Sequence, residues 1–102
     1  MRSAVLAAIG RHLPLEGCAV FLFGSMAAGR GRRYSDYDVG LWAAGPISYG
    51  ILSKIEEDIE DLPVDVELVD FSEVSRDFKR TSLQEVEVWN APKSGLPWNL
   101  GF

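Results

Sequence analysis

Hydrophobic positions along the chain predict helices and strands in alternation. Residues 2–12 carry apolar side chains at helical spacing, and residues 48–61 do the same with acidic residues on the other side. Both patterns predict amphipathic helices. Between them, residues 19–23 form a continuous apolar run with β-branched and aromatic content, typical of a strand buried on both faces. Residues 36–42 predict a second strand.

The second half of the chain continues the alternation. Residues 64–71 predict a third strand of period two, in which Asp65 and Glu67 point to one face and Asp70 to the other. Residues 72–83 then predict a helix, for which Ser72 and Ser75 are both suitable N-terminal caps. Residues 86–89 predict a short last strand.

These elements predict an α/β fold, with a small mixed β-sheet and helices packed mainly on one face. With 102 residues the chain is too short for two hydrophobic cores, so we expect a single domain over residues 1–102. Residues 90–102 are a tail rich in Pro, Gly and Trp that either packs on the domain or faces a partner.

Composition and charge exclude several classes of function. The apolar fraction of 47% and the charged fraction of 25% are those of a globular protein. A net charge of −5 argues against a general nucleic-acid binder. The N-terminal apolar run is too short to span a membrane and lacks a signal-peptide cleavage site, so we expect a cytoplasmic protein. Cys18, the only cysteine, is interpreted as a core residue.

Two further features have simple structural interpretations. His12 is the only histidine of the chain, so it has no second histidine with which to share a metal. We interpret it as a half-buried residue at a helix end. The acidic residues between Glu56 and Asp61 are interpreted as the solvated face of their helix.

Gly24 and Ser25 directly follow the first strand, where a helix N-terminus would present free backbone N–H groups. Such a terminus can bind an anion such as a phosphate. Glycine allows close approach of the backbone, and the serine adds a hydroxyl donor.

Asp36 and Asp38 lie two residues apart at the start of the second strand, so their carboxylates project from the same face. Paired carboxylates there can share a hard cation such as Mg²⁺. The pair suits two-metal phosphoryl chemistry. Asp65 and Glu67 are candidates for a third carboxylate if the third strand lies beside the second.

The order and spacing of these residues, G-S-(ten residues)-D-x-D between two apolar strands, resemble the polymerase-β-like nucleotidyltransferase superfamily. The segment LPVDVELVDFSEV is also similar to the L-P-x-x-V-D-hydrophobic pattern found there. Within this superfamily the chain most resembles the minimal nucleotidyltransferases. These are single-domain prokaryotic proteins often encoded beside a HEPN-domain partner as toxin–antitoxin pairs.

The resemblance implies a Mg²⁺-dependent transfer of AMP from ATP to a tyrosine hydroxyl of a HEPN-type ribonuclease toxin, which this chain would neutralise as the antitoxin. It implies two Mg²⁺ ions. The implied catalytic and metal-binding residues are Asp36 and Asp38, with Glu67 or Asp65 as the third carboxylate.

The resemblance also implies that Gly24 and Ser25 bind the nucleoside triphosphate, and Ser35, just before the aspartate pair, fits the same pattern. Family members often carry arginines where this chain has Met26 and Ala28. The phosphate contacts would then either be weaker or be supplied by an arginine of the following loop, which carries Arg30, Arg32 and Arg33.

Two other functions stay open at this point. One is a non-catalytic antitoxin or binding module that silences its partner by contact alone. The other is transfer to a nucleic acid or to a small molecule such as an aminoglycoside, for which so short a chain has little room to hold the acceptor.

Overall fold

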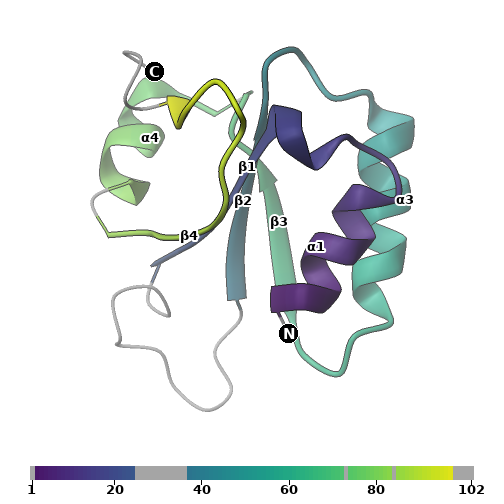
Figure 1. The fold of residues 1–102 in the computed structure, drawn as a ribbon. Coiled ribbons are helices and arrows are strands. Elements are labelled where there is room, and N and C mark those ends of the chain that lie inside the picture. Colours follow the sequence, from purple (N-terminus) through teal and green to yellow (C-terminus); the bar gives the residue numbers. More distant parts are fainter. Residues whose placement is uncertain (1, 25–36, 73, 84, 98–102) are drawn as a thin grey trace.

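The structure is a computed structural model, and it describes residues 2–24, 37–72, 74–83 and 85–97. Helices and strands alternate as the sequence predicts (Figure 1). In chain order the elements are α1 (Arg2–Gly10), the 3₁₀ turn η1 (Leu15–Gly17), β1 (Cys18–Phe23), β2 (Tyr37–Ala43), α3 (Tyr49–Glu60), β3 (Val66–Asp70), α4 (Arg76–Ser82) and β4 (Glu87–Asn90).

The four strands form one sheet in the order β3-β2-β1-β4. β1 runs antiparallel to both β2 and β4, whereas β2 and β3 run parallel. The predicted mixed sheet is therefore confirmed. β1 ends and both β2 and β3 begin at the same end of the sheet, which is the lower end in Figure 1.

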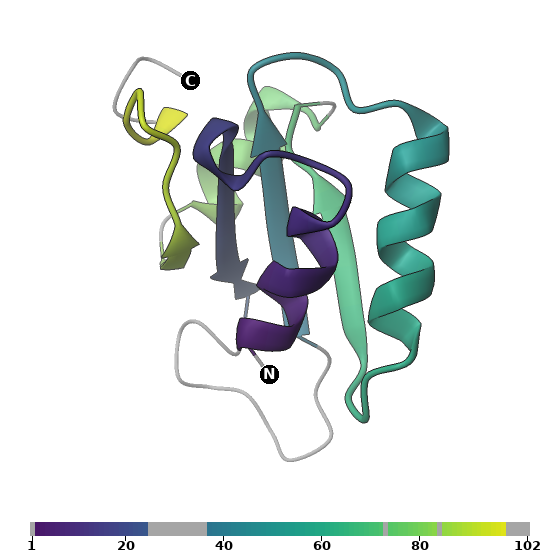
Figure 2. The same ribbon diagram turned by 45° about the vertical axis from the view of Figure 1, so that its right-hand side comes forward.

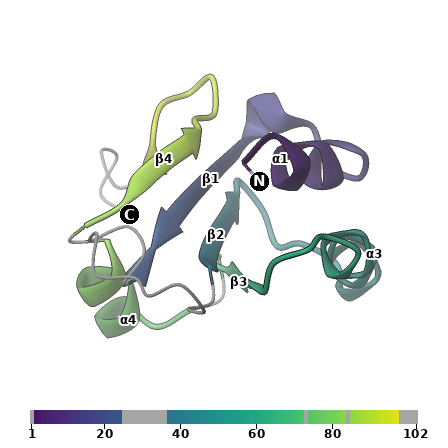
Figure 3. The same cartoon turned by 90° about the horizontal axis from the view of Figure 1, so that it is seen from below.

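Among the helices that the structure describes, two cover one face of the sheet and one covers the other. Figure 3 shows α1 and α3 on the same side and α4 on the opposite side, and Figure 2 shows α1 lying over the strands with α3 beside it. The larger core, under α1 and α3, is built by even-numbered residues of β1 and odd-numbered residues of β2. Its fully buried members include Val5, Ile9, Val20, Val39, Leu41 and Ile55.

The core on the α4 side is smaller and mostly aromatic. Phe21 and Phe71 are fully buried, and their rings meet nearly edge to face with centroids 4.8 Å apart. Phe21 lies opposite Gly40 of β2. A Cβ atom on Gly40 would collide with the Phe21 ring and lie 2.9 Å from Phe71 Cε1. Glycine at this strand position thus makes room for two aromatic rings.

Serine side chains fix the N-termini of α3 and α4. Ser48 Oγ accepts a hydrogen bond from the Ile51 amide at 3.3 Å, and Ser75 Oγ accepts one from the Phe78 amide at 3.1 Å. Of the two caps that the sequence allows for α4, Ser75 is the one used. Ser72 belongs to a turn instead, because its amide donates to Asp70 Oδ1 at 2.9 Å.

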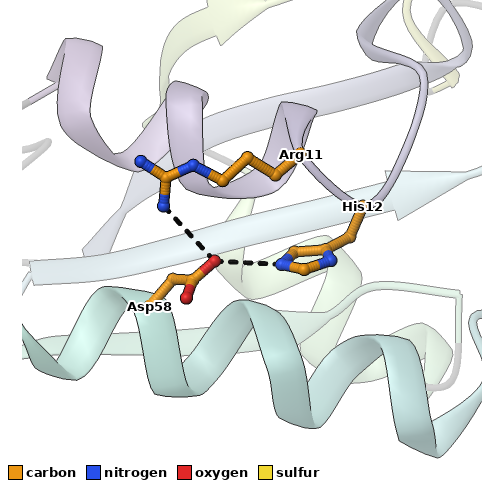
Figure 4. Close-up of polar contacts among 3 residues, drawn as sticks. All are labelled: Arg11, His12 and Asp58. Carbon is orange, nitrogen blue, oxygen red and sulfur yellow. Dashed lines mark hydrogen bonds and ion pairs between the residues drawn. The ribbon is translucent and has the colours of Figure 1, made fainter.

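A polar contact joins α3 to the end of α1. Asp58 Oδ2 lies 2.9 Å from His12 Nε2 and 3.4 Å from the Arg11 guanidinium (Figure 4). The hydrogen bond from His12 holds the pKa of Asp58 below its ordinary value of 3.8, with Arg11 adding to the effect. His12 is therefore the half-buried helix-end residue that the sequence predicts. Asp58 differs from its acidic neighbours, because it is paired rather than only solvated.

The segment after β4 packs on the domain as far as the structure describes it. The Lys93 amide donates to the Glu16 carbonyl at 2.9 Å, and Pro92 and Pro97 are buried. The Asn90 amide group also donates to the carbonyls of Leu15 and Cys18, at 2.8 and 3.0 Å. Residues 91–97 therefore contact the domain, whereas 98–102 lie outside the described residues. A partner-facing role for the tail stays a prediction.

None of the helices in the described ranges combines the length and the apolar character needed to cross a membrane.

Candidate active site

Three residues on neighbouring strands form a row at the end of the sheet where β1 stops. Phe23 of β1 is paired with Asp38 of β2, and Asp38 is paired with Glu67 of β3. Side chains of paired residues on adjacent strands project from the same face. Asp38 and Glu67 therefore lie side by side, on the face that carries the aromatic core and α4.

Gly24 follows Phe23 at the end of β1 and lies next to Asp38. Its φ of +77° lies in the left-handed region that glycine adopts without strain. A Cβ atom at this position would overlap Asp38 Oδ2. The backbone just after β1 thus lies in direct contact with the carboxylate of β2, with no room for any other residue type.

Asp65 lies one residue before β3, and its carbonyl accepts a hydrogen bond from the Tyr37 amide at 2.9 Å. It is exposed, as is Glu67. The pairing of the strands sets Glu67 directly beside Asp38, whereas Asp65 lies two residues earlier along the chain. Register therefore favours Glu67 as the partner of Asp38.

Several predicted site residues lie outside the described residues. They are Ser25, Arg30, Ser35 and Asp36, together with Met26, Ala28, Arg32 and Arg33, which also entered the sequence argument. Their roles stay predictions.

The described residues offer part of a cation site. Asp38 and Glu67 supply carboxylate oxygens, the ligands that Mg²⁺ prefers, and the Gly24 backbone lies against the Asp38 carboxylate. Among the residues that the structure describes, no group of three or more His, Cys, Asp or Glu side chains could hold a metal ion. The residues present fit a magnesium ion if Asp36 adds its carboxylate.

Other candidate groups are separated from the row. Asp70 pairs with Leu41, so it belongs to the opposite face, as predicted. Cys18 is buried, and burial raises the pKa of its thiol. This confirms a core role for Cys18 and makes it a poor nucleophile.

Phe78, an aromatic residue close to the row, is not among the site residues that the sequence predicts. Phe78 of α4 is 40% exposed, and its ring centroid lies 6.1 Å from that of Phe23. The signal in the sequence is a single aromatic residue within the charged run RDFKR. Periodicity does not show that α4 brings it next to the end of β1.

The family follows from a match over most of the chain. Residues 17–90 match the family described as polymerase beta, nucleotidyltransferase. This range contains β1, β2 and β3 with Gly24, Asp38 and Glu67. The chain belongs to this nucleotidyltransferase family.

One curated relative is similar to part of the chain. The chain is 32% identical over 62 residues to a probable protein adenylyltransferase MntA of Haemophilus influenzae. The match covers 59% of this chain and 54% of the relative, so the chain spans about half the length of that protein.

Solved structures share the fold. A crystal structure of a toxin–antitoxin with AMP-PNP contains a chain with a TM-score of 0.74 and 20% identity, covering 96% of this chain and 76% of that one. A tri-AMPylated HEPN toxin in complex with an MNT antitoxin, from Shewanella oneidensis, gives a TM-score of 0.65 at 18% identity, over 86% and 67% of the two chains. At this identity the likeness shows the fold alone.

Proposed function

We propose that this chain is a Mg²⁺-dependent nucleotidyltransferase that transfers AMP from ATP to a tyrosine hydroxyl of a HEPN-type toxin and so acts as its antitoxin. The observation that carries the proposal is the row at the end of β1. There Gly24 lies against the carboxylate of Asp38, and Glu67 stands beside Asp38 on the next strand. The names of the MntA relative and of the AMPylated toxin complex support the acceptor class.

The reaction forms one bond and breaks one. The acceptor oxygen forms a bond to the α-phosphorus of ATP, and the bond from that phosphorus to the bridging oxygen of the β-phosphate breaks. Pyrophosphate leaves, and the hydroxyl proton passes to a base or to water. Bound Mg²⁺ would neutralise charge on the phosphates and lower the pKa of the acceptor hydroxyl.

The described residues have distinct parts in this proposal. Asp38 would hold Mg²⁺ together with Asp36. Glu67, placed beside Asp38 by the strand register, would add a third carboxylate for a second ion. Gly24 lets the phosphates approach the backbone, because any side chain there would fill the space next to Asp38.

The remaining roles come from the sequence pattern. Ser25, Ser35 and Arg30 are proposed to bind the triphosphate. A cytoplasmic location is also proposed, since a buried free thiol at Cys18 suits a reducing compartment.

Intact-mass spectrometry tests the proposal. A HEPN-domain toxin is incubated with this chain, Mg²⁺ and each nucleoside triphosphate in turn, with Asp38→Asn as the matched control. We expect a mass increase equal to one or more AMP groups with ATP and the wild-type chain, and none with Asp38→Asn. A complex that forms equally well with both proteins and never carries an adduct would contradict the proposal.

A further inference from the structure

Phe78 is an aromatic residue with a large exposed surface on a charged helix. Its neighbours in α4 are Arg76, Asp77, Lys79 and Arg80, yet 40% of Phe78 is open to solvent. Burial of a phenylalanine in the core would remove most of that surface from water. The exposed part of the ring is therefore available to a ligand.

The ring of Phe78 is held in place by two aromatic residues of the core. It packs against Phe71 with centroids 5.6 Å apart and against Phe23 with centroids 6.1 Å apart, the second pair at 82°. Phe71 is fully buried and Phe23 is 6% exposed. A ring supported by buried aromatic residues loses little freedom when a ligand binds to it, which favours binding.

The position of Phe78 relates it to the candidate active site. Phe23, which supports it, is the residue before Gly24 and is paired with Asp38. The exposed ring is thus separated from the Asp38 carboxylate by a single side chain along the face of the sheet. In a nucleoside triphosphate a single ribose separates the α-phosphate from the base, so the base of a nucleotide bound near Asp38 has to lie close to this end of the sheet.

We propose that Phe78 is a stacking surface for the base of the nucleoside triphosphate. The inference rests on the proposed function. An aromatic ring has no charge and no strong hydrogen-bond donor for phosphate or ribose, whereas it gains free energy from stacking on any base. Stacking of this kind tightens nucleotide binding without choosing between bases, so the preference for ATP is set by other groups.

The test separates the base from the phosphates. KM for ATP is measured for the wild type, Phe78→Leu and Phe78→Tyr, together with inhibition by inorganic tripolyphosphate, a competitor without a base. Leucine keeps apolar packing against Phe23 and Phe71, and tyrosine keeps the ring. Thermal unfolding of each variant shows that it is folded.

We expect Phe78→Leu to raise KM for ATP by roughly 5- to 100-fold, the range given by loss of one stacked base. kcat should change little, and Phe78→Tyr should behave like the wild type. Inhibition by tripolyphosphate should be the same for all three proteins, because Phe78 does not touch the phosphates. If Phe78 had only a structural role, its replacement would weaken the binding of ATP and of tripolyphosphate to the same extent.

Three outcomes would overturn the inference. A wild-type chain that transfers AMP while Phe78→Leu keeps its KM for ATP would remove the stacking role and leave the proposed function in place. Equal weakening of ATP binding and tripolyphosphate binding in Phe78→Leu would show that the substitution distorts the site. A wild-type chain that neither binds ATP nor transfers AMP would remove the proposed function and the stacking role together.

Discussion

At the scale of single residues, one glycine links the backbone to the site chemistry. Gly24 has a left-handed φ and also lies where its own Cβ would meet Asp38 Oδ2. Glycine is thus required at this position for two separate reasons, the backbone conformation and the lack of space for a Cβ atom. Gly95 shares only the first, since its φ is +97° and an added Cβ would meet nothing within 4 Å. The two positions therefore form a matched pair.

Gly24→Ala should lower both stability and activity. Left-handed backbone costs an alanine about 1–2 kcal/mol, and displacement of the Asp38 carboxylate should slow AMP transfer by roughly 100-fold, since misplacing reacting groups by about 1 Å has that effect. Urea unfolding and the rate of adduct formation measure the two effects.

Gly95→Ala is the control. It should lose only the roughly 1–2 kcal/mol that comes from the backbone conformation and keep the transfer rate of the wild type. If both variants lost activity equally, the contact between Gly24 and Asp38 would have no special part in the site.

At the scale of elements, most of the fold is predictable from the sequence. The helical spacing in 48–61 and the apolar run in 19–23 are local signals, and both elements form close to the predicted bounds. The start of α4 at Arg76 is less predictable, because Ser72 and Ser75 are equally good caps until the turn at Asp70 engages Ser72.

The candidate site is predictable only in part. Spacing along the chain indicates Asp38 and two candidates for the third carboxylate, Asp65 and Glu67. The choice between them depends on the register of β2 and β3, which cannot be read from spacing. In the structure Asp38 pairs with Glu67. Phe78 escaped the sequence argument for the same reason, since its neighbour Phe23 lies far away in the sequence.

The register of β3 leads to a prediction about the third carboxylate. Glu67→Gln should reduce AMP transfer by roughly 100-fold or more, because Gln keeps the shape and removes the charge that would hold the second metal ion. Asp65→Asn, an equivalent change on the same face, should reduce it by less than about threefold. The two rates are compared at saturating ATP and Mg²⁺. A larger loss in Asp65→Asn would assign the third carboxylate to Asp65.

The contact between α1 and α3 predicts a pH dependence of stability. The pKa of Asp58 is lower in the folded chain than its ordinary value of 3.8, so the unfolded chain binds this proton more readily. The stabilisation is complete above about pH 4 and is lost as the pH falls through the lower pKa of the folded state.

Asp58→Asn should remove this part of the acid-induced loss. The free energy of unfolding, measured by urea titration between about pH 5 and pH 2, should fall less steeply with decreasing pH in the variant than in the wild type. Glu57→Gln changes an exposed neighbour on the same helix and should leave the slope as it is. Equal slopes in Asp58→Asn and the wild type would show that the His12 contact has no effect on stability.

At the scale of the whole molecule, the larger core and the candidate site lie on different faces of the sheet. α1 and α3 bury the larger core on one face. The row of Phe23, Asp38 and Glu67 lies at the end of the other face. Changes at the row therefore leave the main core intact. This separation allows a substitution at the row that removes catalysis while keeping the chain folded.

Asp38→Asn uses this separation to decide how the chain would act as an antitoxin. Co-expressed with the HEPN-domain protein, the wild-type chain should restore growth of cells that the toxin alone arrests. If neutralisation depends on AMP transfer, Asp38→Asn should lose it and leave the toxin without adduct, although thermal unfolding shows the variant folded. Asp61→Asn, an exposed aspartate after α3, is the control and should neutralise fully. Growth restored by Asp38→Asn would instead mean that the chain silences its partner by binding, with the family's fold retained and its chemistry unused.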